Sequence, residues 1–261
     1  MTLEHEHVLA IPVFNEQEYL TGVLDQARQF SSNILVIDDG STDATPDMLR
    51  AYPGIRVLTH AENRGYGKSL ADAFSFARRS GYRWLITMDC DEQHEASRIP
   101  AFLAAAAEDD ADIISGTRYP NGEDIENIAP PDRREINREI TATLNHRLGL
   151  EITDAFCGFK AYRVSALSRL RITVPGYAMP MQFWAQAAMA GLRIRELPVP
   201  LIYNDPSRHF GGLLDDPAVR LQHYLTVLEN ELAGEYACAA SGDRVVICRR
   251  AFLDRCSTLC D

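Results

Sequence analysis

Short apolar runs alternate with segments of helical spacing through the first half of the chain, and this alternation constrains the fold more than any other feature of the sequence. Between the first two runs, Leu20, Val23, Leu24 and Ala27 recur at the spacing of one helix face, which favours a helix packed on a sheet. Repeated strand–helix units predict an α/β fold with a mostly parallel sheet flanked by helices. The runs of strand character cover residues 7–14, 34–39, 55–60, 84–89 and 111–116.

The second half of the chain has a less regular pattern. Residues 120–133 form a polar stretch with Pro and Gly, for which we expect a mobile loop that orders as a lid when a ligand binds. We expect one domain over residues 1–233 and a C-terminal extension, 234–261, whose structure the pattern does not define. Helices are predicted at 134–148, 177–190 and 217–232, a turn followed by an extended segment at 154–163, and a strand within 193–203.

Composition and charge exclude several classes of function. The net charge of -11 and the pI near 5.1 argue against nucleic acid, and against an anionic membrane surface, as the main partner. No run approaches the roughly 18 apolar residues of a membrane span, and the N-terminus lacks the features of a signal peptide. We therefore expect a cytoplasmic protein, with peripheral contact to a membrane left open. No CxxC pair occurs, so we expect free thiols at Cys90, Cys157, Cys238, Cys248, Cys256 and Cys260.

Acidic and amide side chains stand at the ends of three predicted strands. In parallel sheets the loops at the carboxyl ends of the strands meet at one crevice, where ligands bind. A carboxylate there can accept a hydrogen bond from a nucleobase N–H or a ribose hydroxyl. Carboxylates that gather in one place repel each other unless a cation or hydrogen-bond donors compensate them. We therefore expect the ligand site to include Asn15 and Glu16, Asp38 and Asp39, and Asp89 and Asp91.

The stretch DCDEQH at 89–94 has the residue types of a metal site. Asp89 and Asp91 point to opposite faces of an extended backbone, so they converge on one ion only if the chain turns. In that case Mg²⁺ or Mn²⁺ fits, with Gln93 as a further oxygen ligand. The alternative is a solvated acidic loop in which Asp89 caps the next helix. For His94 and His209 we expect hydrogen-bonding roles in the core or at the rim of the site.

Glycines at 65 and 67 precede Lys68 without completing a known phosphate loop. A Walker A motif requires glycine where the chain has Glu62, and the dinucleotide fingerprint requires glycine where it has Leu70. We expect a glycine turn before an amphipathic helix, with Lys68 as a contact of a diphosphate.

Seven segments together resemble family 2 glycosyltransferases, most of all the dolichol-phosphate mannose synthase branch. They occur in the family's order over about residues 7–212. The resemblance implies a GT-A fold, a GDP- or UDP-sugar donor, a divalent metal and inversion at the anomeric carbon. It also implies transfer of mannose or glucose to a polyprenyl phosphate or another acceptor. The segments are IPVFNE, VIDDGSTDAT, NRGYGKSLADAF, MDCDEQH, SGTRY, DAFCGFKAYR and RELPVPLIY.

The resemblance also implies roles for individual residues. Pro12, Phe14 and Glu16 match nucleotide contacts after the first strand, and Asp39 matches the acidic residue that follows the second. Asp89, Asp91 and Gln93 match the motif for metal and diphosphate. An arginine's planar fork suits phosphate oxygens. The arginines that match residues near the phosphates and the acceptor are Arg118, one of Arg133 or Arg134, and Arg208.

Three positions depart from the pattern of the lipid-phosphate enzymes. Pro175 stands where a basic residue is usual, Gln182 replaces a glutamate, and Leu214 stands at the place of a lysine. These changes predict a less basic acceptor side and leave a lipid phosphate less certain as the acceptor.

The catalytic residues predicted are Asp91, Arg118 and Asp154. A phosphate acceptor needs no general base, whereas a hydroxyl acceptor needs a carboxylate, for which Asp154 is the candidate. A catalytically silent nucleotide-sugar-binding protein and a nucleotidyltransferase are the alternatives to a glycosyltransferase. The sequence leaves the oligomeric state open.

Overall fold

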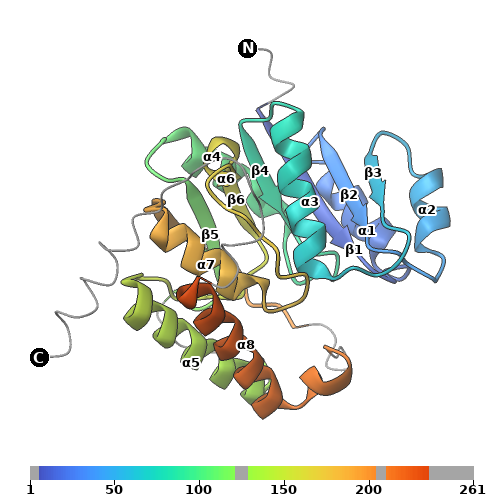
Figure 1. Cartoon of the computed structure of the whole chain (residues 1–261). Helices are drawn as coiled ribbons and strands as arrows, with labels where there is room; N and C mark the ends of the chain where they lie inside the picture. The colour runs from blue at the N-terminus through green and yellow to red at the C-terminus, as the bar shows by residue number, and fades with distance from the viewer. Residues whose placement is uncertain (1–5, 121–128, 204–209, 235–261) are drawn as a thin grey trace, which may run out of the picture.

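A computed structural model describes residues 6–120, 129–203 and 210–234 (Figure 1). Within these residues seven strands form one sheet in the order β3-β2-β1-β4-β6-β5-β7. Strand β6 is antiparallel to both of its neighbours, and the other pairs are parallel. The mostly parallel sheet predicted from the sequence is thus confirmed. The strands are β1 His7–Val13, β2 Ile34–Asp38, β3 Arg56–Thr59, β4 Trp84–Thr87, β5 Ile113–Thr117, β6 Lys160–Arg163 and β7 Ile194–Pro198.

Helices cover both faces of the sheet because its strands are apolar on both sides. In β1, Val8 and Ala10 belong to one buried cluster, while Leu9 and Ile11 belong to the other. One face is covered by α1 Leu20–Ala27, α2 Thr45–Ala51 and α4 Ile99–Ala107. The other face is covered by α3 Tyr66–Arg79, α6 Val164–Leu167 and α7 Met179–Met189, onto which α5 Pro131–Leu148 and α8 Pro217–Ala233 pack. Two short 3-10 helices, η2 Ala96–Arg98 and η3 Gly212–Asp215, precede α4 and α8.

The strand order places a switch in chain direction between β1 and β4. The chain moves from β1 outward to β2 and β3, and then returns to add β4 on the opposite side of β1. Loops that leave neighbouring strands in opposite directions open a crevice at the carboxyl end of the sheet. The segments after β1 and β4 hold the predicted ligand residues, so the topology brings them to one edge.

The predicted elements agree with the structure to within a few residues. Strand β4 ends at Thr87, so Asp89 belongs to the following loop and not to the strand. Helix α5 begins at Pro131, where the proline fits the first turn of a helix. Helix α8 ends at Ala233, where Gly234 takes a left-handed conformation (φ 77°). The rest of the predicted C-terminal extension, with its four cysteines, lies outside the described residues.

The N-terminal turn of α3 packs against the segment before α7 without room for a side chain at Gly67. A Cβ atom there would lie 2.3 Å from the Val174 carbonyl oxygen and 2.7 Å from Met179 Cβ. Both neighbours are buried, so relief requires a movement of the backbone.

We predict that Gly67→Ala lowers the free energy of unfolding by about 2 kcal/mol, the usual cost of an added methyl group in a packed interior. Urea unfolding measures it. Gly176→Ala is the matched control, because no atom lies within 4 Å of its Cβ position. Equal stability of the two variants would contradict the packing described.

Candidate active site

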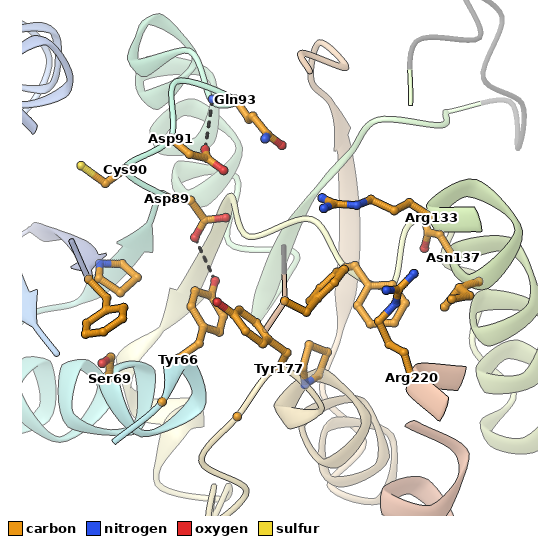
Figure 2. A pocket seen from close by; sticks show the side chains of 18 of the residues that line it. Tyr66, Ser69, Asp89, Cys90, Asp91, Gln93, Arg133, Asn137, Tyr177 and Arg220 are labelled. Atoms are coloured by element: carbon orange, nitrogen blue, oxygen red, sulfur yellow. Dashed lines mark hydrogen bonds between the residues drawn. The ribbon is translucent and has the colours of Figure 1, made fainter. Parts of the chain in front are cut away.

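A cavity of about 600 Å³ opens at the carboxyl ends of β1, β2 and β4. It extends from the N-terminal half of α3 to helices α5 and α8, and it has three parts. One end is lined by residues that follow β1 and β2, the middle by the acidic turn after β4, and the far end by arginines and aromatic rings. Figure 2 shows the middle and the far end, with Asp89 and Asp91 on one side and Arg133 and Arg220 on the other.

The first end of the cavity holds Pro12, Phe14, Glu16 and Asp39, as predicted. The Asp39 carboxylate is 4% exposed and accepts three hydrogen bonds. The backbone N–H groups of Arg64 and Gly65 donate to it at 2.9 and 2.8 Å, and His60 Nδ1 lies 2.6 Å from Oδ1. These contacts fix Asp39 as a hydrogen-bond acceptor that faces the cavity.

A chain of hydrogen bonds and an ion pair runs from Asp39 away from the cavity. His60 Nε2 lies 2.9 Å from Asp72 Oδ2, and Asp72 also pairs with Lys68. Desolvation would raise the pKa of Asp72, but hydrogen bonds from Lys68 and His60 lower it below its usual value. The structure therefore corrects the prediction for Lys68. Its ammonium group pairs with Asp72 and does not line the cavity.

The turn after β4 brings Asp89, Asp91 and Gln93 to the wall of the cavity. Asp91 Oδ1 accepts the backbone N–H of Gln93 at 3.1 Å (Figure 2). Glu92, between them, takes a left-handed conformation (φ 57°). His94 Nδ1 accepts the N–H of Asp89 at 3.1 Å, so His94 stabilises the turn from the core. The turn that the sequence required for convergence is present.

The Asp89 carboxylate is the most constrained group of this turn. Tyr66 donates its hydroxyl to Asp89 Oδ1 at 3.0 Å (Figure 2). Burial raises the pKa of the Asp89 carboxyl, and the neighbouring charge of Asp91 raises it further. Two neighbouring carboxylates repel each other, and a divalent cation bound between them would offset this repulsion.

The residues of the turn fit Mg²⁺ or Mn²⁺ held together with a substrate. Within the described residues, no group of three or more His, Cys, Asp and Glu side chains is arranged to hold a metal. Magnesium is usually bound by one or two carboxylates together with phosphate oxygens and waters. Asp89 and Asp91 supply the carboxylates of such a site, and Gln93 an amide oxygen.

We predict that Gly158→Ala weakens the binding of a divalent metal without unfolding the protein. A Cβ atom at Gly158 would lie 2.2 Å from Asp89 Oδ2, so the carboxylate must leave its position. Binding of Mn²⁺ should weaken at least about tenfold, since even the loss of a partner of a metal ligand costs about 10- to 100-fold in metal affinity. Calorimetric titration with Mn²⁺ measures the loss, with circular dichroism as the test of folding. Unchanged affinity for Mn²⁺ would contradict this role of Asp89.

Arg118 and Asp154 form a buried ion pair between the acidic turn and the far end. Arg118 Nε and Nη2 donate to the two oxygens of Asp154 at 2.7 and 3.0 Å. Asn137 and the backbone of Phe156 donate to the same carboxylate, which is 0% exposed. Burial would raise the pKa of Asp154, but Arg118 lowers it to about 2.

The structure contradicts the expectation that Asp154 faces the acceptor as a general base. Its carboxylate lies behind Arg118, does not line the cavity and is saturated with hydrogen-bond donors. A carboxyl whose pKa is about 2 also accepts a proton poorly at neutral pH. Asp154 instead positions Arg118, which does line the cavity.

We predict that Asp154→Asn lowers the free energy of unfolding at neutral pH by about 3 kcal/mol, because a largely buried guanidinium loses its countercharge. A carboxyl whose pKa is lowered from 3.8 to about 2 in the folded protein stabilises it fully above pH 3.8 and loses this effect as the pH falls toward 2. The difference between wild type and variant should therefore shrink on acidification. Urea unfolding of both proteins between neutral pH and the acidic range measures this difference. If it stays constant with pH, the ion pair is not its source.

The far end of the cavity combines positive charge with aromatic rings. Arg133 lies over the rings of Tyr203 and Phe210, at 5.3 and 4.9 Å from their centroids. Arg220 lies 4.4 Å from the centroid of Phe210 and is held by Asp132 and by the Leu214 carbonyl, at 2.6 and 2.8 Å. Tyr177 stands against Phe210 with its ring edge-on. Such a surface suits a ligand that is anionic at one point and apolar beside it.

Sequence reasoning missed Arg220, although the sequence carries a signal for it. Arg220 is 3% exposed and shares the buried face of α8 with Tyr224, Val227 and Leu228. Spacings of four, seven and eight residues along a helix mark one face. An arginine on an otherwise apolar stripe is therefore a candidate for a buried functional group. Tyr66, Ser69 and Tyr177 also line the cavity and were not predicted.

Three further predicted residues lie away from the cavity. Asn15 Oδ1 accepts the N–H groups of Thr42 and Asp43, and Asp38 Oδ1 accepts that of Ser41, so both shape the loop between β2 and α2. Of the two candidate arginines, Arg133 lines the cavity and Arg134 does not. Arg208 and His209 lie outside the described residues, as does most of the predicted lid, at 121–128.

The departures from the lipid-phosphate pattern lie behind the cavity wall. Gln182 is 0% exposed, accepts the N–H groups of Thr173 and Val174, and donates to Glu231 at 2.7 Å. The Pro175 carbonyl accepts the N–H of Lys68, and the Leu214 carbonyl holds Arg220. These residues therefore support the cavity, while Arg133 and Arg220 make its far end basic.

Comparison with known proteins places the chain in a family. The family model described as Glycosyl transferase family 2 matches residues 8–171. The chain belongs to this family. An undecaprenyl-phosphate mannosyltransferase from Micrococcus luteus is 30% identical to this glycosyltransferase over 225 residues, which are 82% of this chain and 91% of the relative. A polyprenol monophosphomannose synthase from Mycolicibacterium smegmatis is 27% identical over 202 residues, 74% of this chain and 76% of the relative. The predicted family and branch are thereby confirmed.

Solved structures confirm the GT-A fold of the glycosyltransferase. Mannosyl-3-phosphoglycerate synthase from Rubrobacter xylanophilus has a TM-score of 0.68 at 16% identity, covering 94% of this chain and 79% of that protein. Glucosyl-3-phosphoglycerate synthase from Mycobacterium tuberculosis, solved with Mn²⁺, uridine diphosphate and phosphoglyceric acid, has a TM-score of 0.65 at 16% identity, with 91% and 81% covered. Among the described parts of the chain, no helix has the length and apolar character needed to cross a membrane.

Proposed function

We propose that this glycosyltransferase transfers mannose or glucose, with inversion, from a GDP- or UDP-sugar to a polyprenyl phosphate. The observation that carries the proposal is the character of the far end of the cavity. Its described lining includes Arg118, Arg133 and Arg220 together with aromatic rings, and it includes no carboxylate. The names of the Micrococcus and Mycolicibacterium relatives support a polyprenyl-phosphate acceptor.

The donor is proposed to lie along the first end and the middle of the cavity. Its nucleoside faces Pro12, Phe14 and Asp39, and its diphosphate reaches the acidic turn. Asp89 and Asp91, with Gln93, would hold Mg²⁺ or Mn²⁺, which when bound supplies positive charge to the departing nucleoside diphosphate. Arg118 stands at the boundary with the far end, where its charge also favours the leaving phosphates.

The carboxylates beside the described far end are paired with arginines, Asp132 with Arg220 and Asp154 with Arg118, which favours a phosphate acceptor over a hydroxyl acceptor. A phosphate monoester carries between one and two negative charges at neutral pH, since its second pKa is about 6, so its oxygen attacks without losing a proton to the protein. An alcohol would need a carboxylate within reach, and Asp154 is withdrawn behind Arg118. Arg133 and Arg220 are proposed to bind the acceptor phosphate, with Tyr177 and Phe210 beside its first prenyl unit.

We predict that Arg133→Ala reduces kcat/KM for undecaprenyl phosphate by about 30-fold, because a charge-assisted hydrogen bond to phosphate contributes about 2 kcal/mol. Binding of the donor should stay unchanged. Transfer of radiolabelled sugar from GDP-mannose and UDP-glucose to undecaprenyl phosphate, with Mn²⁺ present, measures the effect.

Arg138→Ala is the matched control for this experiment. It lies on the same helix, is exposed and pairs with Glu135, outside the cavity. Undecaprenol, which lacks the phosphate, is the control acceptor. Equal transfer to undecaprenol, or full activity of Arg133→Ala, would contradict a phosphate site at the far end. Donor binding without transfer to any acceptor would favour a silent binding protein.

A further inference from the structure

The hydroxyl of Ser69 is a buried polar group that faces the cavity without a partner. Ser69 lies in α3 and is 0% exposed, and its side chain lines the cavity (Figure 2). Its Oγ has no hydrogen-bond partner among the residues that the structure describes. A buried hydroxyl without a hydrogen-bond partner lowers the stability of the protein unless a ligand or a water molecule forms a hydrogen bond with it. In the proposed function, neither the metal nor the arginines that bind the acceptor would form a hydrogen bond with Ser69 Oγ.

Ser69 lies on the nucleoside side of the acidic turn. Tyr66 and Ser69 are three residues apart on α3, so they share one face of the helix. Tyr66 reaches Asp89 at the middle of the cavity, whereas Arg133 and Arg220 lie beyond it on the far side (Figure 2). Asp39 and Ser69 both line the cavity, and Gly65, at the start of α3, donates its N–H to Asp39. With the diphosphate at Asp89 and Asp91, the group nearest Ser69 is the nucleobase.

We propose that Ser69 is a specificity-determining residue whose hydroxyl donates a hydrogen bond to a carbonyl oxygen of the donor's nucleobase. The inference rests on the proposed function, since it assumes a nucleotide-sugar donor. Asp39 restricts the base further. Its carboxylate is fixed as an acceptor by His60, Arg64 and Gly65, so the edge that faces it must offer an N–H.

This pair of contacts selects bases by chemistry. Guanine and uracil carry a ring N–H next to a carbonyl group, which matches an acceptor at Asp39 and a donor at Ser69. Adenine and cytosine carry at that place a ring nitrogen without hydrogen, which sets an acceptor against the Asp39 carboxylate. These bases should therefore not enter the position that brings their amino group to Ser69. A site that hydrogen-bonds a ligand group discriminates strongly against analogues that lack it.

Calorimetric titration of the full chain with UDP, GDP, ADP and CDP, each with Mn²⁺, tests the proposal. Wild type should prefer UDP or GDP. Ser69→Ala should bind the preferred nucleotide about tenfold more weakly, as expected for one lost hydrogen bond, and should bind ADP and CDP as wild type does. Ser75→Ala on the same helix is the matched control, because Ser75 accepts a hydrogen bond from Arg79 outside the cavity and its loss should change none of the four affinities.

Thermal melting without nucleotide separates a ligand contact from a structural one. Since Ser69 Oγ has no partner among the described residues, Ser69→Ala should melt at the same or a higher temperature than wild type. Unchanged affinity for the preferred nucleotide, equal loss for all four, or a lower melting temperature with unchanged binding would each overturn the proposal. Failure of the proposed function gives a different result, in which wild type binds none of the four nucleotides.

Discussion

The bidentate ion pair of Arg118 and Asp154 joins the two halves of the molecule. Arg118 follows β5, Asp154 lies in the loop that leads to β6, and Asn137 of α5 donates to the same carboxylate. The neighbouring backbone is tied down as well, because Glu196 of β7 accepts the N–H groups of Thr153 and Asp154. The sheet that carries the acidic turn and the helices that carry the far-end arginines are thus held at a fixed separation. The cavity between them depends on this junction.

The cavity also shows how an acidic protein can receive anionic ligands. The net charge of -11 describes the whole chain, but exposed charges are screened beyond roughly 8 Å at physiological ionic strength. Arg118, Arg133 and Arg220 line a common pocket, where screening is weaker. Aromatic rings and the carboxylates of Asp132 and Asp154 hold these side chains in place. Asp132 and Asp154 offset part of the charge of two arginines, but the far end still presents guanidinium N–H groups to a ligand although the chain as a whole is negative.

The sequence predicted the parts of the site that follow directly from strand order. Residues next to the ends of β1, β2 and β4 must meet at the same edge, and Pro12, Asp39 and Asp89 do line one cavity there. Prediction failed where the direction of a side chain depends on a distant partner. Asp154 turns to Arg118, a partner that local spacing does not reveal. Lys68 pairs with Asp72 one turn along α3, an i,i+4 spacing that the sequence does show but that the prediction did not use. Arg220 reaches the cavity from a helix far along the chain, which strand order does not place.

The buried contact of Gln182 with Glu231 links the identities of two residues on different helices. Gln182 donates to one carboxylate oxygen of Glu231, and Gln186 donates to the other. A glutamate at position 182, the usual residue in the lipid-phosphate pattern, would place two carboxylates together in the core. Such a protein needs a neutral or basic residue at position 231. Positions 182 and 231 should therefore covary among homologues, because the charge that the buried pair carries can lie on α7 or on α8 but not on both.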